Sequence, residues 1–155
     1  MSPQSPKLES RRISEVWSDV QLLAIIIPSG YREQGIHFFT PEAFSQQVAY
    51  IRHPAGQPIA SHVHNAVVRE VRNTLEVLVI KSGRLRVDLY DDGRVYCESR
   101  ILEAGDTILL VSGGHGFEVL EEVEMIEIRQ GPYVSDGGDK TRFPPVPADQ
   151  LRVRS

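Results

Sequence analysis

The feature that most constrains the fold is a series of short β-patterned runs separated by turn residues in the second half of the chain. In the clearest run, Leu85 to Tyr90, apolar and polar residues alternate, as in a strand with one buried face. Asp91 to Gly93 then predicts a hairpin turn, with the glycine at a position that can take a positive φ. Strands at such short intervals predict an all-β barrel or sandwich. The runs that follow are Val95 to Ile101, Thr107 to Val111 after a turn at Glu103 to Asp106, and Phe117 to Leu120 with Val123 to Ile128, which we expect to form a hairpin across Glu121 and Glu122.

The first half of the chain adds three shorter runs that we expect to join the same domain. They are Val20 to Ile27, whose branched residues favour a buried strand, then His37 to Phe39, and Val48 to Arg52. A length of 155 residues suits one domain. We therefore expect a flexible N-terminal segment (1–18), a β-barrel (19–135) and an irregular C-terminal tail (136–155).

Charge and composition narrow the environment and the partners. The net charge is -4 at pH 7, which favours neither nucleic acid nor an acidic membrane surface. The single cysteine, Cys97, allows no intramolecular disulfide and fits a reducing compartment, and its alternation with Val95 and Ser99 favours a core position. We find neither a membrane-spanning apolar run nor the apolar core of a signal peptide, so we expect a cytoplasmic protein.

Three histidines and one glutamate are the candidates for chemistry. His62 and His64 stand two apart, so a strand would direct both imidazoles to one face. Glu76 opens one strand-like run, and His115 follows another through a Ser-Gly-Gly turn. Imidazole nitrogens with one carboxylate suit zinc, iron, manganese, nickel or copper. Each residue also has a structural alternative, as a solvated strand histidine, a surface glutamate or a turn histidine bonded to the backbone.

The spacing of these residues resembles the first motif of the cupin family. That motif reads glycine, five residues, His-x-His, three or four residues, Glu, six residues, glycine. Gly56, His62 and His64 match its first part, and Glu76 and Gly83 match its last part. The difference is that eleven residues separate His64 from Glu76 where the family has three or four.

A second stretch is similar to the second cupin motif, which reads glycine, five residues, Pro-x-Gly, two residues, His, three residues, Asn. Gly105, Val111 and His115 fit this order, but valine replaces proline, one residue is missing before the histidine, and Val119 stands where asparagine would. The resemblance covers about residues 46–130 and implies an all-β double-stranded β-helix, or jelly-roll barrel. It implies one divalent ion, whether iron, manganese, nickel or zinc, with a set of ligands in which Glu70 is the alternative carboxylate. That set is His62, His64, Glu76 and His115.

The insertion between the two halves of the first motif, Asn65 to Thr74, should lie at the rim of the pocket. Loops held by a rigid scaffold often carry binding residues. We assign Arg69 as the candidate substrate-binding residue, because its planar fork matches a carboxylate or phosphate. Arg72 is the alternative, and both arginines could instead be solvated or paired with Glu70. The three valines of the insertion suggest that it also has a packed side.

Three functions are open at this point. The first is a metal-binding cupin acting on a small polar molecule, possible reactions being those of a dioxygenase, isomerase or epimerase. The second is a binding or sensing module without chemistry, and the third is a metal-free sugar-nucleotide epimerase or ketoisomerase. We also expect a homodimer, because an isolated barrel leaves strand edges to cover, and Val20 to Ile27 could add to a neighbouring subunit's sheet.

Overall fold

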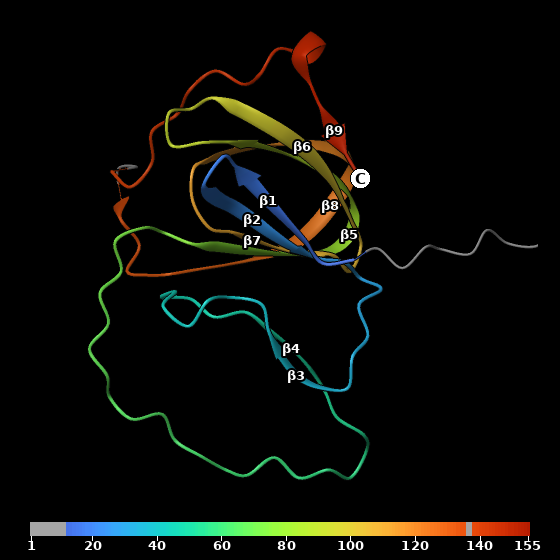
Figure 1. Ribbon diagram of the computed structural model, residues 1–155, viewed down its shortest axis with the longest axis vertical. Helices are drawn as coiled ribbons and strands as arrows, with labels where there is room; N and C mark the ends of the chain where they lie inside the picture. Colours follow the sequence, from blue (N-terminus) through green and yellow to red (C-terminus); the bar gives the residue numbers. More distant parts are fainter. Residues whose placement is uncertain (1–11, 136–137) are drawn as a thin grey trace, which may run out of the picture.

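The computed structural model describes residues 12–135 and 138–155, and this part of the chain folds as an all-β protein (Figure 1). One sheet has the strand order β1-β2-β7-β5-β6-β9, with β8 on the other side of β5, while β3 and β4 form a separate pair. Within the described residues, no helix has the length and apolarity needed to cross a bilayer. The strands are β1 (Ser14–Ser18), β2 (Gln21–Ile27), β3 (Gly35–Phe38), β4 (Ala49–Arg52), β5 (Glu76–Tyr90), β6 (Tyr96–Glu103), β7 (Thr107–Leu110), β8 (Gly114–Arg129) and β9 (Val153–Arg154).

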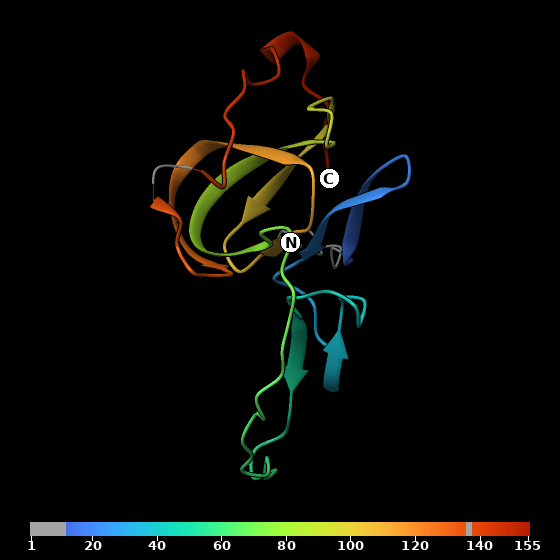
Figure 2. The same ribbon diagram turned by 90° about the vertical axis from the view of Figure 1, so that its left-hand side faces the viewer.

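The two longest strands, β5 and β8, organise the fold. They pair antiparallel from Glu76 opposite Arg129 to Tyr90 opposite Gly114. On the other side of β5, its first residues pair with β7 and its last residues pair with β6, so β5 belongs to both halves of the sheet. The sheet curls strongly into a half-barrel, which Figures 1 and 2 show from two directions. This shape is compatible with a β-barrel of the jelly-roll kind.

Gly83 allows β5 and β8 to bend together. The register between the strands shifts on both sides of Ser82 and again after Arg84, around this glycine. Gly83 has a φ of +83°, a conformation that side chains disfavour. A Cβ at this position would lie 1.9 Å from the carbonyl oxygen of Glu122, so a larger residue cannot be accommodated without moving the backbone.

The hairpin predicted at Glu121 and Glu122 is therefore wrong. Strand β8 runs without a turn from Gly114 to Arg129, and the two glutamates lie in its bulged middle. The other predicted hairpin, after Tyr90, is confirmed by the hydrogen bond from Asp91 N to Val95 O. There the positive φ falls on Arg94, at 65°, rather than on Gly93.

Apolar side chains form one cluster on each face of the curled sheet. Leu85, Val87 and Leu89 of β5 point into the concave side and are fully buried, as their alternation predicts. Val77 and Leu109 belong to the second cluster, on the convex face. Phe39, Phe44 and Val48, from the segments beside β3 and β4, pack against this second cluster.

The ends of the described chain add to the sheet. The predicted buried strand is confirmed as β2, which lies between β1 and β7. Strand β1 lies inside the segment predicted to be flexible, whose residues 1–11 fall outside the described residues, as do Asp136 and Gly137 of the tail. The rest of the tail is largely irregular, but a 3-10 turn (Ala148–Gln150) leads into β9, which pairs parallel with β6.

A long segment, residues 53–74, joins β4 to β5, and we call it the arm. It contains no strand, so the strand predicted around His62 and His64 is wrong. The hydrogen bonds found within residues 53–69 are local, such as Gln57 N to Pro54 O, and no neighbouring strand provides a ladder. Figures 1 and 2 show the arm projecting away from the half-barrel. Val67, Val68 and Val71, the three valines of the insertion that were expected to pack, are exposed.

Candidate functional site

The centre of the candidate site is a contact between Glu76 and His115. Glu76 is the first residue of β5, and His115 is the second residue of β8. The register places His115 opposite Leu89, near the far end of β5 from Glu76. Because the paired strands curl, Nε2 of His115 nevertheless lies 3.1 Å from Oε2 of Glu76. Two of the four predicted ligands are therefore brought together.

The Glu76 carboxylate is buried and has cations near it. Glu76 is 8% exposed, Arg129 Nη1 lies 3.8 Å from its Oε1, and Lys140 Nζ lies 4.0 Å from the same oxygen. The hydrogen bond with His115 lowers the pKa of Glu76, burial raises it, and electrostatic interactions with His115, Lys140 and Arg129 lower it further. Glu76 is thus held as an ionised carboxylate that orients His115.

A cavity of about 680 Å³ opens over this contact. Glu76 is the one buried charged residue in the described lining, whereas the other charged lining residues are exposed. The lining carries both signs, with acids at Glu76, Asp92 and Asp139. Its cations come from two parts of the chain, the end of the arm and the tail, and they are Arg72, Lys140 and Arg142.

The tail forms one wall of the cavity. The rings of Phe143 and Tyr90 meet edge to face, with centroids 5.0 Å apart. A Cβ on Gly114 would lie 2.8 Å from the Phe143 ring, so this glycine leaves room for the wall. The Tyr90 hydroxyl accepts a hydrogen bond from Val146 N at 2.9 Å, and burial raises the pKa of Tyr90. Sequence reasoning missed Phe143 and Val146 because the tail has no periodic pattern.

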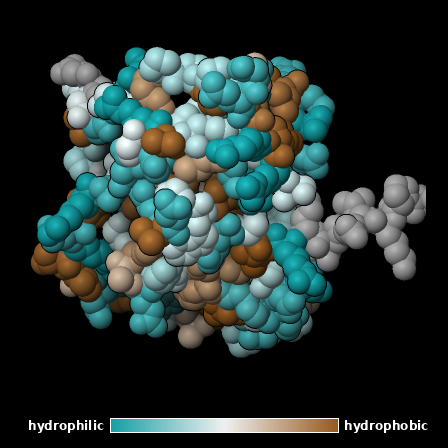
Figure 3. All heavy atoms as spheres, turned by 45° about the horizontal axis from the view of Figure 1, so that its top comes forward, coloured by the Kyte–Doolittle hydropathy of each residue, from teal (hydrophilic) through white to brown (hydrophobic). Residues whose placement is uncertain are grey.

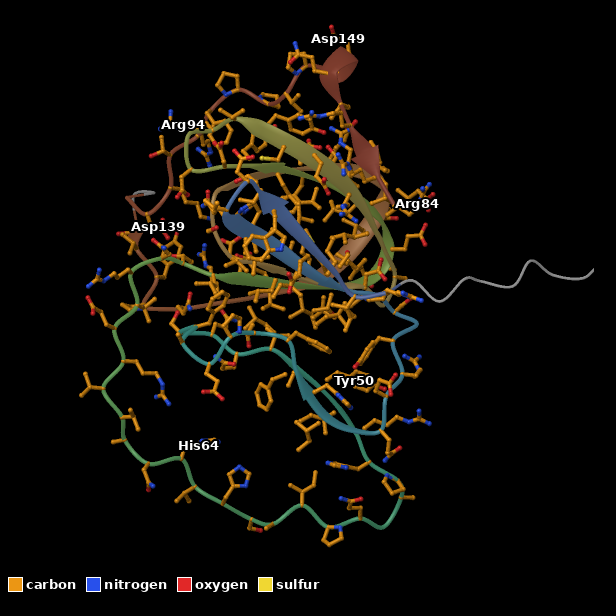
Figure 4. All side chains as sticks on the ribbon, in the orientation of Figure 1. Tyr50, His64, Arg84, Arg94, Asp139 and Asp149 are labelled. Carbon is orange, nitrogen blue, oxygen red and sulfur yellow. The ribbon has the colours of Figure 1, made fainter. Side chains whose placement is uncertain are left out.

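His62 and His64 lie on the arm, apart from the cavity. Their rings are 5.2 Å apart and edge to face, and Nδ1 of His62 lies 2.9 Å from the carbonyl oxygen of Ala60. Figure 4 shows His64 far from Asp139, a cavity residue. The predicted ligands therefore form two separate pairs. Within the described ranges, no three His, Cys, Asp or Glu residues are grouped so that they could hold a metal ion.

The predicted anion-binding residue, Arg69, is exposed on the arm and is not among the described residues lining the cavity. Arg72 does line the cavity, and its Nε lies 3.0 Å from Oε1 of Glu70. Both side chains of this pair are more than 70% exposed, so the pair contributes little to stability. It is Glu76, rather than Glu70, that contacts His115.

A buried carboxylate with an imidazole beside a cavity has two chemical uses. It can supply oxygen and nitrogen ligands to a metal ion, or it can orient the imidazole for proton transfer to a bound molecule. Similarity does not choose between them, since no protein-family model, no curated protein and no solved structure matches this chain.

Proposed function

We propose that the chain is a cupin that binds a small anionic organic molecule in the 680 Å³ cavity and acts on it with one divalent metal ion. The observation that carries the proposal is the contact between Glu76 and His115. The cupin resemblance implies that both are metal ligands, and the curl of β5 and β8 brings them together at the cavity.

The donor set fits a metal ion only in part. One carboxylate oxygen and one imidazole nitrogen suit iron, manganese, nickel or zinc, but protein metal sites usually have three or four ligands. With the arm as it lies here, His62 and His64 do not complete the set. Glu76 and His115 would hold part of the coordination sphere, and a bound ion would supply Lewis acidity toward a carbonyl or a water molecule.

The cations around the cavity favour an anionic group on the ligand. Arg72 offers a planar fork, and Lys140 and Arg142 approach from the tail. Asp92 and Asp139 also line the cavity, and carboxylates accept hydrogen bonds from hydroxyl groups. A molecule that carries both a phosphate or carboxylate and several hydroxyls therefore suits this lining.

A metal-free reaction is the second candidate, and the same contact favours it. A carboxylate that orients an imidazole is a general acid–base arrangement, and Tyr90 supplies a second proton-carrying group in the cavity lining. This arrangement fits the epimerase or ketoisomerase hypothesis, in which His and Tyr act as acid and base. Here His115 would exchange a proton with the substrate, and Glu76 would stabilise the imidazolium.

Metal content and ligand binding, measured on one protein, distinguish these functions. Protein purified without added metal is analysed for metal ions, then titrated calorimetrically with small carboxylates, sugar phosphates and sugar nucleotides. The variants are Glu76→Gln and His115→Ala, with His37→Ala as the control, since His37 contacts Gln34 outside the cavity. About one ion per chain, lost in the first two variants and kept in the control, supports the metal-binding proposal.

Two other outcomes would support the metal-free enzyme or the binding module. A metal-free wild type that converts a sugar nucleotide, with conversion lost in His115→Ala, supports the second candidate and contradicts the first. Tight ligand binding without turnover, with or without a metal ion, identifies a binding or sensing module instead.

A further inference from the structure

One edge of β8 has no partner strand in the described part of the chain, since β8 pairs with β5 alone. Phe117 lies opposite Val87, and Val119 opposite Leu85, so both face the concave side of the sheet. Yet Phe117 is 40% exposed and Val119 57% exposed, because the half-barrel has no wall beyond β8. Long, exposed apolar edges of this kind pair readily with another strand.

The convex side of the same strand is also uncovered. Ile126 and Ile128 are about half exposed, although the residues opposite them on β5 belong to the second apolar cluster. Exposed apolar and polar side chains intermingle on the face seen in Figure 3. Apolar side chains of β8 are therefore exposed on both faces of the sheet.

The arm has exposed apolar residues and, among the described residues, no partner strand, so it is complementary to the free edge of β8. Ile59 is 69% exposed and Val63 is 86% exposed, on backbone that belongs to no strand or helix. In a strand, Val63 would point to one face and both His62 and His64 to the other. The hydrogen bonds found for residues 53–69 stay within the arm and bind it to no other strand.

Strand β8 is acidic and the arm is not, and this difference in charge favours pairing between them. Strand β8 carries five glutamates and one arginine, whereas no acidic residue stands between Glu42 and Glu70. Lys81, Arg84 and Arg86 contact glutamates of β8 from the β5 side, which leaves the other side to a partner. The arm would bring His62, His64 and Arg69 to that side.

We propose that residues 59–64 of the arm add as a strand to the free edge of β8 in a second copy of the chain, and that the exchange is reciprocal. The arm leaves from β4, and the segments beside the β3–β4 pair are packed on the convex face, so it projects away from its own half-barrel (Figure 2). Two copies related by a two-fold axis then cover both free edges and close the assembly.

The exchange has a consequence for the candidate site, and this step alone rests on the proposed function. A strand beside β8 with its histidines on the concave face places His62 and His64 on the side that carries His115. Each metal site would then combine Glu76 and His115 of one copy with His62 and His64 of the other.

Photo-crosslinking tests the exchange without reference to metal. Chains with benzoylphenylalanine in place of Val63 are refolded with ¹⁵N-labelled wild type in the presence of a chelator, irradiated, and mapped by mass spectrometry. We expect crosslinks from the unlabelled arm to labelled peptides within residues 114–129. The control carries benzoylphenylalanine in place of Val20, which is 91% exposed in the β1–β2 turn. It should give no crosslinks to residues 114–129.

Crosslinks to β8 only within one chain, or a wild-type chain that light scattering shows to be monomeric, would overturn the exchange. A mixture of two variants tests the shared metal site independently of the exchange. The double variant His62→Ala/His64→Ala is refolded with Glu76→Gln/His115→Ala and equilibrated with Zn²⁺. Mixed dimers should regain one of the two sites. Crosslinks between copies without regained Zn²⁺ would support the exchange and contradict the shared metal site.

Discussion

The carboxylate of Glu76 and the imidazole of His115 are 3.1 Å apart, although the register of β5 and β8 places them toward opposite ends of the same pair of strands. The contact exists because the pair curls far enough for its ends to approach. It therefore depends on the residues that permit the bend, as well as on the two residues that make it.

We predict that Gly83→Ala destabilises the fold by about 3 kcal/mol or more, because it combines a strained φ with a backbone clash. Gly56→Ala is the matched control: Gly56 has the same φ, +83°, but nothing lies within 4 Å of its added Cβ. Its loss should be smaller, about 1–2 kcal/mol, the cost of a left-handed φ without a clash. The measurement is the free energy of unfolding in urea, and equal losses would contradict the clash at Glu122.

We predict that His62→Ala/His64→Ala abolishes the proposed binding of a divalent ion, because the exchanged arm would supply both ligands, while the fold survives. Both side chains lie on the exposed arm, away from the two apolar clusters, so their removal should leave the thermal midpoint of the metal-free protein unchanged. Elemental analysis after gel filtration measures occupancy, with His37→Ala as the control. Full occupancy in the double variant would remove these histidines from the ligand set.

We predict that Arg72→Ala weakens binding of an acidic ligand by about 1.5–3 kcal/mol, the usual contribution of a hydrogen bond to a charged group. That is roughly a 10- to 150-fold rise in Kd. Arg69→Ala is the matched control, because Arg69 is absent from the described cavity lining. Calorimetric titration measures both. A larger effect at Arg69 would restore the sequence-based assignment and show that the arm binds differently.

We predict that Cys97 reacts slowly with iodoacetamide in the folded protein. Its side chain packs against the concave core, and burial raises the pKa of its thiol. A raised pKa leaves less thiolate at pH 8, and thiolate is the reactive form. Alkylation should accelerate in urea and, in the folded state, with rising pH. Equal rates in the folded and unfolded states would contradict the burial of this side chain.

The strands were predictable where the local alternation of apolar and polar residues matches the burial that neighbouring strands impose. The run Leu85 to Tyr90 reads as a half-buried strand, and its apolar residues fill the concave core as expected. A polar interruption between two apolar runs, however, can be either a hairpin turn or a bend within one long strand. Glu121 and Glu122 were therefore mistaken for a hairpin, and the deciding contact, between Gly83 and Glu122, is between residues far apart in the sequence.

Half of the candidate site was predictable for a related reason. Glu76 and His115 belong to strands whose neighbours exist within the chain, so motif spacing located them correctly on the sheet. His62 and His64 share a face only if their segment pairs with a strand, and no local pattern shows whether it does. The wall of the cavity, including Lys140 and Phe143, is irregular backbone without a periodic signal.

The position of that wall in the chain affects how the protein is made. Residues 139–145 follow both β5 and β8 in the sequence, so the wall is the last of these parts of the cavity to leave the ribosome. The wall is then added by a segment whose far end, β9, pairs with β6. A chain that ends at Arg129 would therefore lack this wall and would leave Glu76 and His115 open to water and to small molecules.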